Sequence, residues 1–228
     1  MNKAVVLPSE FEIRFQTAFN TPPPYSYQFH VFIKKSEVAK PIAAEFELDY
    51  LYRDQLSEDE VLAEGFSLDT RLHWKGNLPA AWHEPLSQLA SCMDTDAQHG
   101  GNDPDSDLME IVIGSIRYVL HTEKASIILQ ELKQAFLEVL TMERPFEARF
   151  CMQSTSKRKE GQLRASFYDR TVQLKGAKVL SMHWNDFILL LNTIFSADFL
   201  PEKAESKLPK KEGVFLEVGE GLWYELDH

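Results

Sequence analysis

The chain has 228 residues, enough for one large domain or two small ones, and its 44% apolar content excludes global disorder. Acidic side chains outnumber basic ones by 35 to 24, a net charge of −11 at pH 7. This charge disfavours nucleic acid and anionic membranes as partners, because like charges repel over long range. The longest strongly apolar run, residues 187–195, is too short to cross a bilayer. Cys92 and Cys151 form neither a CxxC pair nor a disulfide framework, so we expect a cytoplasmic protein with reduced thiols.

The first part of the chain predicts three strands and a short helix. Apolar and polar residues alternate there as in strands with one buried face. The three alternating segments are residues 10–15, 25–33 and 44–52. NTPPP (20–24) separates the first two, because a helix does not continue through three consecutive prolines. Ser57 and Glu60 form a capping-box pattern, so we expect a short helix that ends at Gly65.

The middle of the chain predicts two helices separated by an acidic loop and an extended pair. Pro79 favours the start of the first helix, since proline is well tolerated in a first helical turn. The acidic stretch DTDAQHGGNDPDSD (94–107) follows, and residues 110–120 then form two extended segments with a turn at Gly114–Ser115. Thr122 is the expected N-cap of the second helix. Its apolar stripe consists of Ala125, Ile128, Leu129, Leu132, Phe136, Val139 and Leu140.

Beyond Pro145 the alternation returns. It predicts three further strands, FEARFCM, QLRASFY and TVQLKG, and a buried helix over residues 181–195. Residues 204–213 are a polar connector, and residues 213–226 predict a hairpin that turns around Gly219–Gly221.

The order of expected elements recurs along the chain. FEIRF (11–15) and FEARF (146–150) share the pattern F-E-x-R-F, and each opens three extended segments that lead into a helix. Duplication of an ancestral unit and the shared composition of antiparallel strands both account for this similarity. We therefore predict an α+β fold of antiparallel meander sheets packed by helices on one side, with a C-terminal β-hairpin. We expect one globular domain over residues 1–228, or two similar halves, 1–93 and 108–228, joined by the acidic loop 94–107.

The acidic loop contains the first candidate site, a metal site at Asp103, Asp105 and Asp107. Calcium loops require oxygen ligands at fixed positions around a turn glycine. Registers that start at Asp94 or Asp103 fail this requirement, because the glycine and the final glutamate are missing. Asp, Asn, Gly and Pro are also typical of a solvated surface loop, which is the structure that we expect here.

The histidines provide a second candidate metal site. His73 and His83 are ten residues apart, and Glu84 follows His83, but zinc hydrolases usually place two histidines one helical turn apart. Ser67 lies in a G-x-S context without the second glycine of a nucleophile elbow. A metal-dependent hydrolase that uses the aspartates or these histidines is therefore an alternative hypothesis.

A basic hairpin tip supports another alternative. Lys157, Arg158 and Lys159 lie between two expected strands, where they could contact the phosphates of a single-stranded nucleic acid while aromatic side chains stack on its bases. Lysines at such tips also serve solubility and protect sheet edges.

The leading hypothesis is a non-enzymatic binding domain for a protein partner or for a second copy of the chain. Phe32 is the one large apolar residue on the polar face of its expected strand, which marks it as a partner contact. We expect no cofactor, because the chain contains neither GxGxxG nor GxxxxGK[ST].

Overall fold

The computed structural model describes residues 8–35, 37, 39–93, 105–176, 179–196 and 203–226, and it confirms the α+β class. The chain divides into two compact units, Met1–Phe136 and Leu137–His228. Each unit contains one six-stranded antiparallel sheet. Helix α3 (Glu123–Val139) runs across the division between the units.

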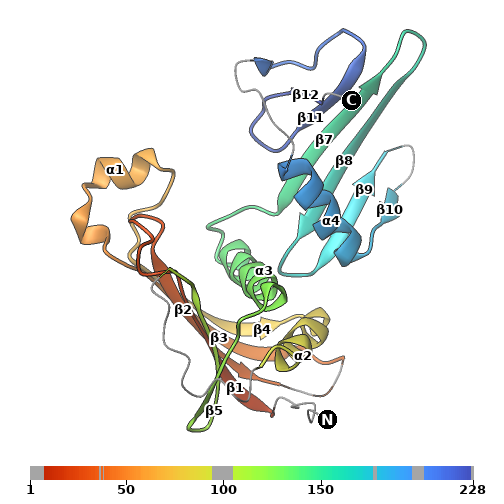
Figure 1. The fold of residues 1–228 in the computed structure, drawn as a ribbon. Helices are drawn as coiled ribbons and strands as arrows, with labels where there is room; N and C mark the ends of the chain where they lie inside the picture. The colour runs from red at the N-terminus through yellow and green to blue at the C-terminus, as the bar shows by residue number, and fades with distance from the viewer. Residues whose placement is uncertain are drawn as a thin grey trace. The chain divides into compact units, whose positions relative to one another are not determined.

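The first sheet combines a four-stranded meander with a hairpin that returns beside its first strand (Figure 1). Its strand order is β4-β3-β2-β1-β5-β6. The strands are β1 (Glu10–Gln16), β2 (Tyr27–Lys34), β3 (Ile42–Tyr50), β4 (Arg71–Leu78), β5 (Leu108–Ile113) and β6 (Ile116–Val119). Because β5 pairs with β1, residues 108–119 belong to the first unit, whereas the sequence assigned them to the second half. The stretch 94–107 therefore connects two elements of one unit.

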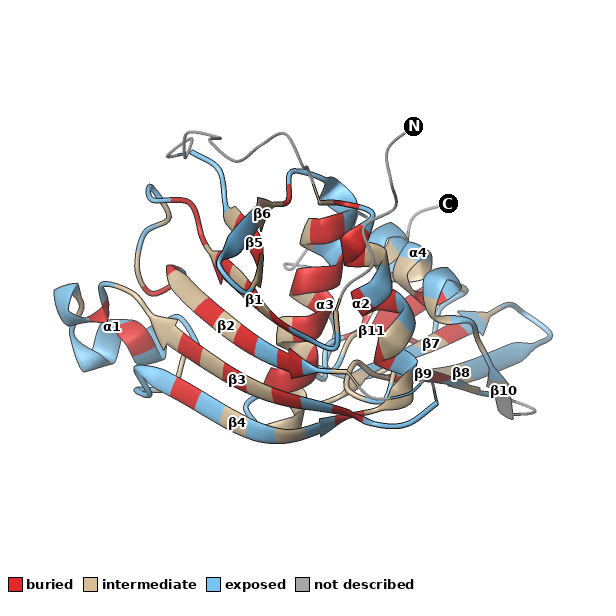
Figure 2. Ribbon diagram, turned by 90° about the horizontal axis from the view of Figure 1, so that it is seen from below, coloured by how far each residue is buried: buried red, intermediate tan, exposed pale blue. Residues whose placement is uncertain are grey.

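Helices cover one face of the first sheet. They are η2 (Ala80–Trp82), α2 (His83–Ala90) and α3. A separate short segment that contains η1 (Arg53–Gln55) and α1 (Glu58–Ala63) lies beyond one end of the strands (Figure 1). Phe46 stacks on Phe136 of α3 with ring centroids 4.3 Å apart, and Trp82 is fully buried. Buried and exposed residues alternate along β2–β4 (Figure 2). Burial of each large aromatic side chain stabilises this core by about 2–3 kcal/mol.

The second sheet repeats the strand order of the first, as β10-β9-β8-β7-β11-β12. Its elements are β7 (Phe146–Gln153), β8 (Arg158–Ser166), β9 (Thr171–Lys175), β10 (Val179–Ser181), α4 (Trp184–Phe195), β11 (Gly213–Glu217) and β12 (Tyr224–Leu226). Phe187 of α4 belongs to a buried core cluster with Ala148, Leu163 and Leu216. The predicted C-terminal hairpin is confirmed as β11 and β12.

The helix predicted over residues 181–195 is present as α4, but the prediction that it is buried was wrong. Only Phe187 of α4 is buried, while Leu189 is 66% and Phe195 59% exposed. The polar residues Asn185, Asp186, Asn192 and Thr193 are all exposed and recur at helical spacing, so α4 is amphipathic, and Leu189 lies within its polar, solvent-facing stripe.

Several local predictions are confirmed. The side chain of Ser57 accepts from the backbone N–H of Glu60, whose carboxylate accepts from the N–H of Ser57, so the capping box is complete. Thr122 accepts from the N–H of Ala125 at 3.2 Å. Gly114, with φ of 61°, lies in the turn between β5 and β6.

Cys92 and Cys151 are both free and buried. Within the described residues, no helix combines the length and the apolar character that a membrane crossing requires.

Candidate binding face of the first sheet

The face of the first sheet opposite α2 and α3 carries polar side chains, and we call it the open face. Two cross-strand rows define it, because residues directly opposite each other point to the same side. The first row is Val112, Glu12, Phe32, Glu45 and Lys75. The second row is Glu110, Arg14, His30, Glu47 and His73.

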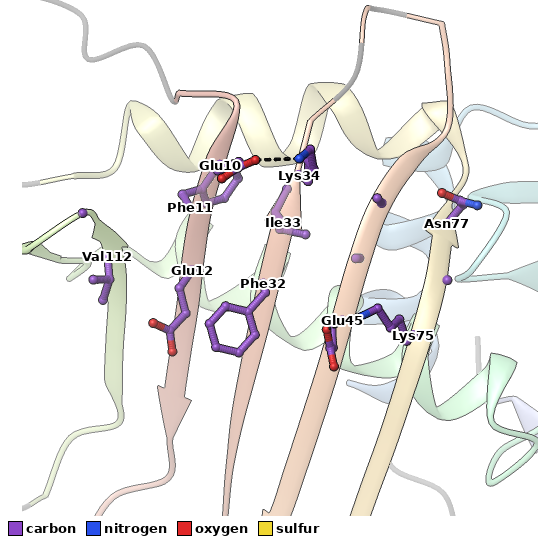
Figure 3. A pocket seen from close by; sticks show the side chains of 14 residues that line it. Glu10, Phe11, Glu12, Phe32, Ile33, Lys34, Glu45, Lys75, Asn77 and Val112 are labelled. Carbon is purple, nitrogen blue, oxygen red and sulfur yellow. Dashed lines mark hydrogen bonds and ion pairs between the residues drawn. The ribbon is translucent and has the colours of Figure 1, made fainter.

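A pocket of about 570 Å³ lies on the open face, and Phe32 stands in its wall between Glu12 and Glu45 (Figure 3). The phenyl side chain is 48% exposed. Ala43 and Gly76 help to line the pocket, and the short side chain of Ala43 leaves space beside the longer Lys34, Lys75 and Asn77. The predicted partner contact Phe32 is therefore a half-exposed aromatic group in a hollow of the sheet surface.

Glu12 anchors the charged groups beside the pocket. Its carboxylate accepts hydrogen bonds from Nε and Nη2 of Arg14, each at 2.7 Å, and lies 2.8 Å from Nδ1 of His30. Burial raises the pKa of Glu12, but the hydrogen bonds from Arg14 and His30 outweigh it, and the net pKa is lowered. The carboxylate is therefore ionised at neutral pH and held in place by two side chains of the neighbouring row.

The mouth of the pocket is bordered by two further ion pairs. Nζ of Lys34 lies 2.8 Å from Oε1 of Glu10, and Nζ of Lys75 lies 2.7 Å from Oε2 of Glu45. The pocket thus has an apolar wall and a rim of charges that already neutralise one another.

Glu45, Glu47 and His73 form a cluster of metal-ligand type on β3 and β4. One ligand atom from each lies within 4.8 Å of the others. Every carboxylate in it also has a cationic partner, since Lys75 binds Glu45 and Arg71 binds Glu47 at 2.8 Å. The hydrogen bonds from Lys75 and His73 lower the pKa of Glu45. A divalent ion would have to displace both cations, so the donor set fits a ladder of ion pairs better than a resident metal.

Of the three predicted metal ligands in the acidic loop, the two that the structure describes, Asp105 and Asp107, have a structural role. Oδ1 of Asp107 accepts from the backbone N–H of Ala18, and Oδ1 of Asp105 accepts from Nδ2 of Asn20, both at 2.8 Å. These bonds join the start of β5 to the loop after β1. Asp103 lies outside the described residues.

The structure does not bring the predicted histidine site together. Nε2 of His83 lies 2.9 Å from the carbonyl oxygen of Lys40, and Glu84 accepts from Gln88 one turn further along α2. Among the described residues, the cluster that contains His73 includes neither His83 nor Glu84.

The basic tip comprises Lys157 in the turn between β7 and β8 and the first two residues of β8, Arg158 and Lys159. The backbone N–H of Ser154 donates to the carbonyl oxygen of Lys157 at 2.9 Å, and Arg158 forms an ion pair with Glu160. On the paired strand β7, Gln153 lies opposite Arg158 and Met152 lies opposite Lys159. These two basic residues therefore have no aromatic side chain directly opposite them on which a nucleobase could stack. Single-stranded nucleic-acid binding through Lys157, Arg158 and Lys159 stays a prediction.

Sequence reasoning missed the acidic partners of His73 and the neighbours of Phe32. Glu12, Glu45, Glu47 and Lys75 all occupy the polar phase of alternating strands, but only the pairing register places them side by side. A search with family models, a search of curated proteins and a search of solved structures each found no match to this chain.

Proposed function

We propose that this protein is a non-enzymatic binding module that holds a polypeptide partner on the open face of its first sheet, with Phe32 as the apolar anchor. The observation that carries the proposal is the pocket of about 570 Å³ with a half-exposed phenylalanine in its wall. Apolar anchors surrounded by polar groups are the usual energetic centre of a protein interface.

The ion pairs of the rim support a role in binding. Glu10 pairs with Lys34, and Glu45 pairs with Lys75, beside the pocket. A partner that covers these pairs would exclude water from an apolar contact without leaving an unpaired charge, which is the costly outcome at an interface. Strands β1, β2, β3 and β5 beneath the pocket are paired on both sides, and the edge strand β4 is paired with β3, so the surface is already organised before a partner arrives.

Photocrosslinking from the pocket tests the proposal. A benzophenone amino acid replaces Ala43 at the pocket or, as the matched control, the exposed Gln173 on β9 of the second sheet. After illumination in a lysate of cells that express the protein, position 43 should form a discrete adduct that Phe32→Ala removes. An adduct with a second copy of the chain would identify self-association. Equal adducts from both positions, or an adduct that persists in Phe32→Ala, would contradict the proposal.

We further propose that the two units descend from one duplicated unit. Support comes from the register: Arg14 lies opposite Glu110 between β1 and β5, and Arg149 lies opposite Glu217 between β7 and β11. Both glutamates are buried, at 8% and 3% exposure, and both arginines belong to the F-E-x-R-F pattern. A shared strand composition does not account for the same buried acid opposite the same arginine. Chains that comprise only one unit and fold cooperatively would support the proposal.

A further inference from the structure

The excursion between β3 and β4, residues 51–70, is larger than the strands require. Asp49 pairs directly with Arg71, so a tight turn could join the two strands there. The chain instead builds η1 and α1 beyond the end of the sheet (Figure 1). We call residues 51–70 the α1 excursion.

A buried arginine organises the α1 excursion. Arg53 is 7% exposed, and its Nη1 donates to the carbonyl oxygens of Ser67 and Asp69, both at 2.6 Å. Its guanidinium carbon lies 3.5 Å from the ring centroid of Tyr50 and 5.2 Å from that of Phe66. These contacts clamp the two ends of the excursion together, so its outer surface has a defined shape.

The α1 excursion exposes several large apolar side chains. Val61 is the buried residue of α1, whereas the next residue, Leu62, is 52% exposed. Leu68 is 46% and Tyr52 38% exposed on the same excursion. Exposed apolar side chains that gather on one ordered segment mark an interaction site more strongly than scattered ones.

The α1 excursion is also strongly acidic. The α1 excursion contains six acidic residues, and its single basic residue is the buried Arg53. Asp54, Glu58 and Asp59 are exposed and have no ion-pair partner among the described residues, unlike the carboxylates of the open face. The first unit as a whole carries 21 acidic and 11 basic side chains, a net charge of −10, and the second unit carries 14 and 13, a net charge of −1.

We infer that the α1 excursion is a second docking surface, whose occupant is a basic amphipathic polypeptide segment of a partner protein. Lysine or arginine side chains of that segment would face Asp54, Glu58 and Asp59, and its apolar side chains would cover Leu62 and Leu68. The unpaired acids provide charge complementarity and raise the association rate, while the leucines provide the buried apolar contact. This inference does not depend on the pocket at Phe32, which lies at the opposite end of the strands.

A defined peptide tests the inference on the full-length chain. The probe is a fluorescent Lys/Leu peptide with helical amphipathic spacing, compared with a scrambled peptide of the same composition. Fluorescence anisotropy should show tighter binding of the amphipathic peptide, and the affinity should fall as salt rises from about 50 to about 300 mM. Hydrogen exchange should show protection within residues 51–70 when the peptide is bound.

Matched variants locate the site. Leu62→Ser should weaken binding about tenfold. Leu189→Ser, at a leucine on α4 that is 66% exposed against 52% for Leu62, should leave it unchanged. The combined change Asp54→Asn, Glu58→Gln and Asp59→Asn should weaken binding more than Glu37→Gln, Glu84→Gln and Glu123→Gln, which remove the same charge elsewhere in the first unit. Circular dichroism confirms that each variant is folded.

Equal binding of the scrambled peptide, or equal losses in the matched variants, would overturn the inference and reveal general attraction to an acidic protein. Protection at the second unit in place of residues 51–70 would also overturn it. Concentration-dependent sedimentation without peptide that Leu62→Ser abolishes would assign the surface to a second copy of the chain and contradict a basic partner segment.

Discussion

Arg149 donates from Nε to Oε2 of Glu217 at 2.7 Å, and the glutamate that it binds is only 3% exposed. The other carboxylate oxygen of Glu217 accepts from the backbone N–H groups of Gly219 and Gly221, each at 2.7 Å. One buried side chain therefore connects the central strand β7 to the turn of the C-terminal hairpin. This network makes Glu217 a buried polar determinant of that hairpin.

Glu217→Gln should lower the free energy of unfolding by about 1–3 kcal/mol, because an uncharged amide replaces a carboxylate that accepts three hydrogen bonds. Urea unfolding followed by circular dichroism measures this change. Glu147→Gln is the control, since Glu147 is 46% exposed and lies 3.4 Å from Arg164; it should change stability by less than about 0.5 kcal/mol. Equal effects of the two substitutions would contradict the role of Glu217.

Stability should depend on pH through the same residue. Burial raises the pKa of Glu217, but the hydrogen bonds from Gly221, Arg149 and Gly219 outweigh it, so the folded-state pKa is below 4.5. A lowered folded pKa means that the stabilisation is present above the unfolded-state pKa and is lost as pH falls below it. The unfolding free energy of the native chain should thus decline more steeply below a pH of 4.5 than that of Glu217→Gln. Parallel declines would exclude this linkage.

The ring of Phe150 lies over Gly161, its direct partner on β8. A Cβ atom at position 161 would lie 2.1 Å from Cζ of Phe150, so the ring must move in Gly161→Ala. We expect a loss of about 1–3 kcal/mol in thermal or urea unfolding. Gly176→Ala is the control, because its nearest neighbour is 3.6 Å away. The combination with Phe150→Leu should recover part of the loss, and strictly additive effects would show that the ring is not the cause.

The cluster of Glu45, Glu47 and His73 predicts little response to metal. Because Lys75 and Arg71 already bind its carboxylates, about 1 mM Zn²⁺ should raise the melting temperature by less than about 1 °C. Lys75→Met combined with Arg71→Met removes the competing cations and should increase the response. A rise of several degrees in the native chain that His73→Ala abolishes would instead support the metal-dependent alternative.

Alternation and capping patterns predicted local structure because their physical causes are local. The strands around Phe11, Phe29 and Phe46 bury every second residue, and the Ser57–Glu60 box starts a helix through contacts within one turn. The partner of each strand is not encoded in its alternation. The pairing of β5 with β1, across more than ninety residues, therefore became visible only in the structure.

The candidate site was predicted only in its most unusual residue. Phe32 stands out in the sequence because a large apolar side chain on a polar face is an exception, whereas Glu12 and Glu45 resemble any exposed strand residue. Their role follows from lying directly opposite Phe32 on both sides. The sequence suggested a metal site at Asp105 and Asp107 because several carboxylates are close together there. In the structure Asp105 accepts a hydrogen bond from Asn20 and Asp107 from Ala18, and these bonds hold a loop in place.

The central claim is tested most directly by titrating the protein with the partner that photocrosslinking from position 43 identifies. Isothermal calorimetry compares the native chain with Phe32→Ala and with Phe195→Ala, whose phenylalanine is 59% exposed on the second unit. Loss of an interface anchor typically costs at least about 2 kcal/mol, so Phe32→Ala should weaken binding about thirtyfold, and Phe195→Ala should leave it unchanged. Native-like affinity in a folded Phe32→Ala protein would contradict the assignment of the open face as the binding surface.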